Sequence, residues 1–84
     1  MARPLSSLRV GEGAEVERVE AATSSDERAV TMRLLEMGFV PGTHVSVVKV
    51  APFGDPLELQ VRGYHVSLRR AEASRVKVRG EGRE

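Results

Sequence analysis

Apolar and polar residues alternate in several short stretches of this chain, which is the pattern of half-buried β-strands. The alternation predicts strands at residues 14–19, 43–50, 57–61, 64–68 and 75–78, and it slips by one position near the end of the first stretch. Apolar residues lie on both sides of 43–50, so we expect this strand to be enclosed in a barrel and to contain a bulge. Short strands with tight turns favour a small closed or half-closed barrel, because closure removes exposed sheet edges.

A second period, that of an α-helix, follows the first predicted strand. Ser24 and Glu27 stand at the spacing of a capping box. Apolar residues then repeat at i, i+4 and i+7 on one face, namely Val30, Leu34 and Met37. The predicted fold class is therefore mainly β, a small barrel of about five strands with one inserted α-helix after the first strand.

The segment that ends the helix carries the densest local signals in the chain. Gly38 suits the left-handed position just past a helix, because it has no Cβ. Pro41 and Gly42 suit the central positions of a type II turn, so Gly38 and Gly42 are predicted to be structural turn residues. Phe39 falls where a helix cap usually places an apolar contact, here back onto Leu34.

The predicted strands and helix together form one domain. Its core is expected to contain Leu34, Val45, Leu59, Val66 and Val76. We place the domain at residues 1–78. Residues 79–84 are charged and contain glycine, so we expect them to form a disordered tail.

Composition restricts the class of protein further. The chain has 84 residues, 13 basic and 12 acidic, with a net charge of +1, which is too balanced to indicate general nucleic-acid binding. The absence of cysteine excludes disulfides and thiolate metal sites. The N-terminus has no apolar region typical of a signal peptide, and no apolar stretch approaches the roughly 20 residues of a membrane span. We therefore expect a cytoplasmic protein.

No pattern of catalytic residues stands out. The phosphate-binding motif G-x-x-x-x-G-K-[ST] is missing, which excludes a P-loop nucleotide hydrolase. Ser67, His65 and Asp55 offer the residue types of a catalytic triad, but a triad is recognised by geometry that a sequence does not supply. We expect no catalytic residues and no enzyme.

Metal ligands are also scarce. A zinc or iron site needs three or four converging ligands, and the chain offers two histidines with a few carboxylates. His44 and His65 are the weak candidates. They lie on different predicted strands and could meet at a surface, but two histidines are too few for such a site. We therefore expect two exposed histidines and neither a metal site nor a cofactor.

Several segments, in their order and spacing, resemble those of a known family. They are Leu5-Ser6-Ser7-Leu8 with Gly11 and Gly13, the run from Arg33 to Gly42, Pro52 to Pro56, Val61 to Arg69, and Ala71-Glu72-Ala73 with Val76-Lys77-Val78. The chain resembles the FeoA family, the small cytoplasmic partners of the bacterial ferrous iron transporter. The resemblance implies an SH3-like barrel with an inserted helix. It also implies a role in iron homeostasis beside the large membrane GTPase that carries Fe²⁺.

Three hypotheses of function follow. The first is a non-enzymatic interaction module that docks on the cytosolic part of the transporter GTPase and is thereby recruited to the inner face of the membrane, without inserting itself. The second is a metal- or effector-responsive sensor, which convergence of His44 and His65 with a carboxylate would support. The third is a nucleic-acid-binding barrel, although no nucleic-acid partner is expected. A continuous basic stripe would support it, formed by Arg62, Arg69, Arg70, Arg75 and Lys77.

The predicted partner-binding surface centres on the helix exit, at Met37, Phe39, Val40 and Pro41. A small barrel has little interior to hold them all, and exposed apolar patches mark interaction sites. The alternative is that Met37 and Phe39 close the end of the barrel. Phe53, in the Pro- and Gly-rich loop 51–56, is expected to anchor that loop.

Overall fold

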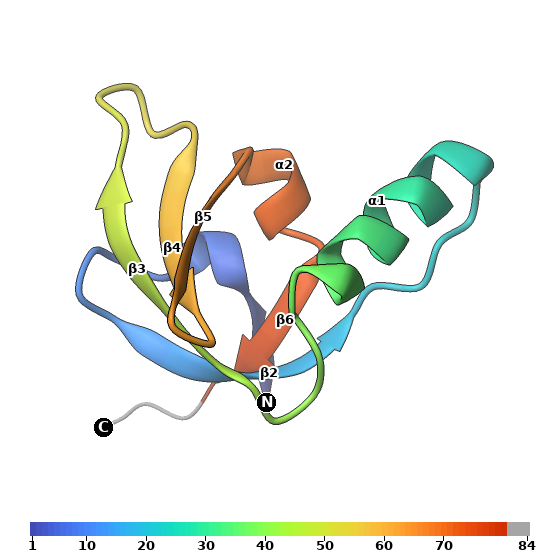
Figure 1. The fold of residues 1–84 in the computed structure, drawn as a ribbon, viewed down its shortest axis with the longest axis horizontal. Coiled ribbons are helices and arrows are strands. Elements are labelled where there is room, and N and C mark those ends of the chain that lie inside the picture. The colour runs from blue at the N-terminus through green and yellow to red at the C-terminus, as the bar shows by residue number, and fades with distance from the viewer. Residues whose placement is uncertain (81–84) are drawn as a thin grey trace.

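In residues 1–80, the part of the chain that the structure describes, six antiparallel strands form one curled sheet in the order β1-β6-β2-β3-β4-β5. The structure is a computed structural model. Its strands are β1 (Ala2–Pro4), β2 (Gly13–Val19), β3 (His44–Val50), β4 (Leu57–Val61), β5 (Tyr64–Leu68) and β6 (Val76–Arg79). Its helices are the 3₁₀ turn η1 (Leu5–Ser7), α1 (Ser25–Glu36) and the short α2 (Arg70–Ala73). The strands curl around a shared interior, and α1 projects from one side (Figure 1).

The periodicity did not predict β1. This strand has three residues and no alternation, and it pairs with β6 so that Ala2 lies opposite Arg79. Arg79 was expected in the tail, and that expectation is wrong because β1 extends the pairing of β6 to this residue. The rest of the expected tail includes residues 81–84, which lie outside the described residues.

Two irregularities of the ladders match irregularities of the sequence. The pairing of β3 with β4 shifts register between Val47 and Lys49, which confirms the bulge expected in this strand. The pairing of β2 with β6 shifts register between Val16 and Arg18. A bulge moves the following side chains to the opposite face. The slipped alternation near the end of β2 is therefore a property of its pairing.

The barrel interior is filled by aliphatic side chains and one aromatic ring. Four of the five predicted core residues are fully buried. Val66 is the exception and is half-buried, packing against the core from its edge. It lies on β5, which has a neighbouring strand on one side only. The buried hydrophobic residues are Leu5, Leu8, Val16, Leu34, Phe39, Val45, Val47, Leu57, Leu59, Val61, Leu68, Ala73, Val76 and Val78.

The start of α1 uses the predicted cap in a modified form. The Ser24 Oγ accepts a hydrogen bond from the Glu27 amide, at 3.1 Å. The Glu27 carboxylate reaches one residue beyond the cap, accepting bonds from the amide of Thr23 at 2.8 Å and from its hydroxyl at 2.7 Å. These bonds satisfy amides that a helix start leaves without partners, so α1 has a defined beginning and a fixed orientation of its first turn.

Candidate partner-binding surface

The exit of α1 is a closed helix cap. The Gly38 amide donates to the Leu35 carbonyl at 3.0 Å, and the Phe39 amide donates to the Leu34 carbonyl at 3.1 Å. Gly38 has a φ of +109°. This is the Schellman pattern, which returns the residue after the glycine toward the last helical turn. This backbone path explains why Phe39 turns back toward Leu34, as the sequence predicts.

The ring of Phe39 is fully buried, beside Leu34 in the core cluster. The expectation that Phe39 contributes to an exposed patch is therefore wrong. The left-handed turn at Gly38 reverses the chain and returns the ring to the core cluster. Of the two interpretations of this segment, Phe39 follows the one in which it closes the barrel.

The turn after Phe39 is held against the sheet. The Thr43 amide donates to the Val40 carbonyl at 3.1 Å, across Pro41 and Gly42, and Gly42 has a φ of +92°. These values fit the predicted type II turn. Hydrogen bonds of 2.8 Å to and from Val16 in β2 join the turn to the barrel. The surface that remains here, called the exit patch below, consists of Met37 and Val40, both half-buried, and the exposed Pro41.

The outward face of α1 carries apolar residues that the sequence reasoning missed. Met32 is 54% exposed and Leu35 is 40% exposed. They stand three positions apart and so neighbour each other on the helix surface. The buried stripe could have identified them, because an apolar residue that lies off the stripe, away from Leu34, is expected to be exposed.

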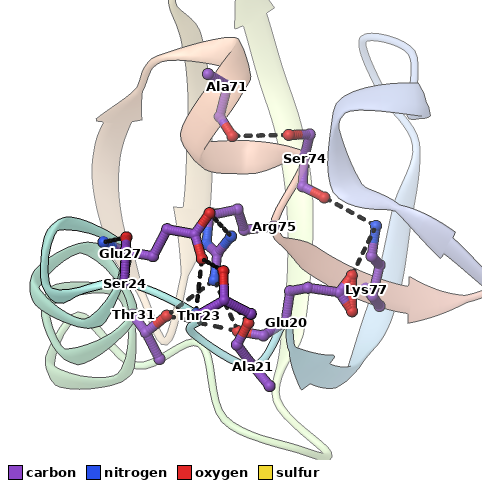
Figure 2. Close-up of polar contacts among 10 residues, drawn as sticks. All are labelled: Glu20, Ala21, Thr23, Ser24, Glu27, Thr31, Ala71, Ser74, Arg75 and Lys77. Carbon is purple, nitrogen blue, oxygen red and sulfur yellow. Dashed lines mark hydrogen bonds and ion pairs between the residues drawn. The ribbon is translucent and has the colours of Figure 1, made fainter.

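A polar network fastens α1 and the segment before it to the barrel (Figure 2). The Arg75 guanidinium donates to the carbonyls of Glu20 at 3.0 Å and Ala21 at 3.3 Å, and to the Thr31 hydroxyl at 3.3 Å. It also lies 3.7 Å from the Glu27 carboxylate. The planar fork of arginine supplies several donors in one fixed geometry, so one side chain holds both the segment 20–21 and α1.

Glu27 is the group in this network whose titration is shifted. The hydrogen bond from the Thr23 amide lowers the pKa of the Glu27 carboxyl, the Thr23 hydroxyl bond lowers it further, and the nearby Arg75 guanidinium adds to this. Each of these favours the charged form of a carboxyl. The helix start is therefore best held when Glu27 is ionised.

Most of the basic residues whose continuous stripe would support nucleic-acid binding are engaged within the chain. Arg70 donates to the carbonyl of Ser6 at 2.7 Å and to that of Gly54 at 2.8 Å. Arg75 is engaged as described, and Lys77 donates to the Ser74 carbonyl at 3.0 Å. Three of the five stripe residues thus bind backbone of the same chain and are partly buried, because each lies where loops and strands converge.

The two histidines do not come together. Both are exposed, His44 on β3 and His65 on β5. Strand β4 separates them, with Gln60 paired to His65 on one side and to Ser46 on the other. Two strand spacings correspond to about 10 Å. Among the described residues, no group of three or more His, Cys, Asp or Glu side chains could hold a metal ion.

The triad residue types are likewise not assembled into a site. His65 and Ser67 lie on β5, and the Asp55 carboxylate accepts a hydrogen bond from the Arg70 amide at 2.9 Å. Asp55 thus orders its own loop.

In the described part of the chain, no helix is long and apolar enough to cross a membrane.

The loop 51–56 contains the largest departure from expectation. Phe53 is 99% exposed, so the prediction that it anchors this loop is wrong. Arg70 does so instead, through the bonds to Gly54 and Asp55 given above. Hydrogen bonds to the Gly54 carbonyl and the Asp55 carboxylate hold the loop and leave the ring outside.

These features define a small β-barrel domain with one inserted helix, whose exposed large apolar side chains include Met32 and Leu35 on the helix and Phe53 in a loop. The chain matches the FeoA domain over residues 3–80. It is 40% identical over 74 residues to an Fe(2+) transport protein A/Fe(2+) transporter FeoB fusion protein of Porphyromonas gingivalis (strain ATCC BAA-308 / W83). That match covers 88% of this chain and 8% of the fusion protein, so the chain spans a small part of that relative.

Solved structures show the same likeness. The zinc-complexed FeoA of Stenotrophomonas maltophilia, described as an SH3 domain protein, is 40% identical with a TM-score of 0.80, covering 90% of this chain and 88% of that one. A FeoA-like protein of Clostridium acetobutylicum is 28% identical with a TM-score of 0.80, covering 99% and 93%. The chain therefore belongs to the FeoA family, a family of small SH3-like domains involved in ferrous iron transport. The resemblance and the fold class inferred from the sequence are both confirmed.

Proposed function

We propose that this chain is a non-enzymatic interaction module that docks on the cytosolic part of the ferrous iron transporter. The observation that carries the proposal is the Porphyromonas gingivalis relative, in which the two proteins are fused in one chain. A covalent link raises the effective concentration of two domains that associate. In this proposal the domain works in the cytoplasm and reaches the inner face of the membrane through its partner.

The exit patch supports the docking surface proposed from the sequence, without Phe39, which is buried. Val40 and Pro41 lie on a turn whose ends are bonded to β2 and closed by the Thr43 amide. A surface that is already ordered loses little conformational entropy when a partner binds. The patch is small, so it would form one part of a larger interface.

The test is a pull-down of the detergent-solubilised transporter with the Val40→Asp and Pro41→Glu variants. We expect both variants to retain less transporter, because a buried charge without a partner opposes binding. Val10→Asp is the matched control, since Val10 is 59% exposed on a different loop. Melting curves establish that each variant is folded. Undiminished binding by folded variants would place the interface elsewhere, and no binding by the unaltered chain would refute the docking proposal.

The two alternative functions gain no support in the described residues. A sensor of the predicted kind needs His44 and His65 near a carboxylate, and β4 lies between them. A nucleic-acid-binding barrel needs the basic stripe, three of whose members bind backbone of the same chain. The docking proposal is the one that the family and the fused relative favour.

A further inference from the structure

Phe53 is the most exposed aromatic residue of the described chain, at 99%, and the neighbouring Pro52 is also exposed. Phenylalanine is among the residue types most often found buried. Single exposed apolar residues are common, so exposure alone does not indicate a site. What sets Phe53 apart is the rigidity of the backbone that presents it.

The loop 51–56 is closed by one hydrogen bond between its two ends and by another within it. The Ala51 amide donates to the Pro56 carbonyl at 3.1 Å, and the Gly54 amide donates to the Ala51 carbonyl at 2.7 Å. Arg70 then joins the loop to the rest of the domain, with its amide on Asp55 at 2.9 Å and its side chain on Gly54 at 2.8 Å. The backbone that carries the ring is therefore held in place, and it would lose little conformational entropy on binding.

A shallow hollow lies beside this loop. Its volume is about 200 Å³, and it is lined by Lys49, Ala51, Pro52, Pro56, Glu58 and Ser67. An engineered apolar cavity of roughly 150 Å³ accepts a benzene ring, so the hollow has room for one side chain of a partner. Protein interfaces often combine a protruding aromatic residue with a pocket, because aromatic anchors fill pockets on the partner.

The size of this surface decides between the possible occupants. The whole chain exposes 5169 Å², and a stable interface buries about 800 Å² on each side, roughly a sixth of that total. One loop cannot supply this, so it does not hold two free copies of the chain together. A lipid surface is also a poor match, because Lys49 is accompanied by the acidic Glu58 and Asp55, and firm membrane binding needs more apolar area or excess positive charge.

A protein that is already held close by other contacts needs only a small additional surface. We propose that Phe53 inserts as an aromatic anchor into an apolar cleft of the ferrous iron transporter's cytosolic part. This inference rests on the proposed function and adds a second contact to it. The loop lies at the top of Figure 1, in yellow, and the exit turn lies at the bottom, in green, so the two contacts are at opposite ends of the domain.

The experiment measures the dissociation constant between the full chain and the transporter in detergent, for the unaltered protein and for Phe53→Ser. We expect Phe53→Ser to bind about tenfold to a hundredfold more weakly, equal to about 1.4–2.8 kcal/mol, with an unchanged melting temperature. Tyr64→Ser is the matched control, because Tyr64 is 73% exposed on β5, and it should change the constant less than about twofold. Phe53→Leu should restore most of the affinity, because it keeps an apolar side chain for the cleft.

Several results would overturn this inference. If the unaltered chain binds and Phe53→Ser binds equally well, the anchor is refuted while the docking proposal stands. If the unaltered chain does not bind the transporter, both are refuted. Sedimentation that shows a dimer lost in Phe53→Ser would make a second copy the occupant. Binding of the chain alone to vesicles of phosphatidylethanolamine and phosphatidylglycerol, lost in Phe53→Ser, would make lipid the occupant.

Discussion

Two loops of this domain each contain proline, glycine and one phenylalanine, but the phenylalanine is buried in one loop and exposed in the other. Phe39, in the exit turn of α1, is 0% exposed, whereas Phe53, in the loop 51–56, is 99% exposed. Residue type therefore does not decide burial here. In the exit turn a glycine with positive φ stands directly before the ring, at Gly38, and in the other loop one stands directly after the ring, at Gly54.

The difference is one of backbone path. The left-handed residue after α1 returns the next side chain to the helix and the barrel, because the two cap hydrogen bonds fold the chain back. Around Phe53 the backbone is held by Arg70 from outside the core. One loop buries its ring in the interior, and the other leaves its ring exposed to solvent.

Truncating the two rings gives the largest expected difference. Phe39→Ala should lower the free energy of unfolding by about 3–5 kcal/mol, because it removes a fully buried aromatic side chain and leaves a cavity. Phe53→Ala should change it by less than about 0.5 kcal/mol, as exposed substitutions usually do. Denaturant unfolding of both variants measures this. Equal losses would break the comparison by showing that the two rings contribute alike to the fold.

Gly38 tests whether the turn explains the burial of Phe39. Gly38→Val should destabilise the domain by about 1–3 kcal/mol, because a φ of +109° is strained for any residue with a Cβ. The added Cβ would also come within 2.8 Å of the Arg62 side chain, which is flexible and can move. Gly42→Ala is the control, with a φ of +92° and no neighbour within 4 Å, so it carries strain alone. A neutral Gly38→Val would remove the explanation given for the exit turn.

Acid should lower the stability that the start of α1 gives to the fold, and this effect should be smaller than those of the two substitutions above. The Thr23 bonds lower the pKa of Glu27 in the folded protein below its unfolded value. A lowered carboxyl pKa stabilises the fold at pH values above the unfolded value, about 4.3, and the effect is lost as the pH falls through the folded value. Glu27→Gln should therefore lower the melting temperature at pH 7 and have less effect at pH 3.

The matched control for acid is Glu36→Gln, because the Glu36 side chain makes no hydrogen bond or ion pair within the described residues. It should leave the melting temperature nearly unchanged at both pH values. An equal shift from both variants would mean that general charge balance, and not the cap at Thr23, sets the response to acid.

Much of the fold was accessible from the sequence because its signals are local. Five strands, the helix with its Ser24 cap, the bulge in β3 and both turn glycines each follow from residues within a few positions of one another. The FeoA resemblance was also read from short segments in a fixed order, and it is confirmed. The candidate surface was predicted less well, because exposure depends on what other segments cover.

What the sequence by itself determined is the set of elements and their turns, since periodicity, caps and glycine conformations act within one stretch of chain. The tertiary structure decided which side chains remain free. The Arg70 side chain donates to the carbonyl of Ser6, far away in the sequence, and β1 supplies the partner that brings Arg79 into the sheet. The exposure of Phe53 depends in the same way on a contact between distant segments, because Arg70 holds its loop. No local pattern encodes such contacts, because they form only when the whole barrel has closed.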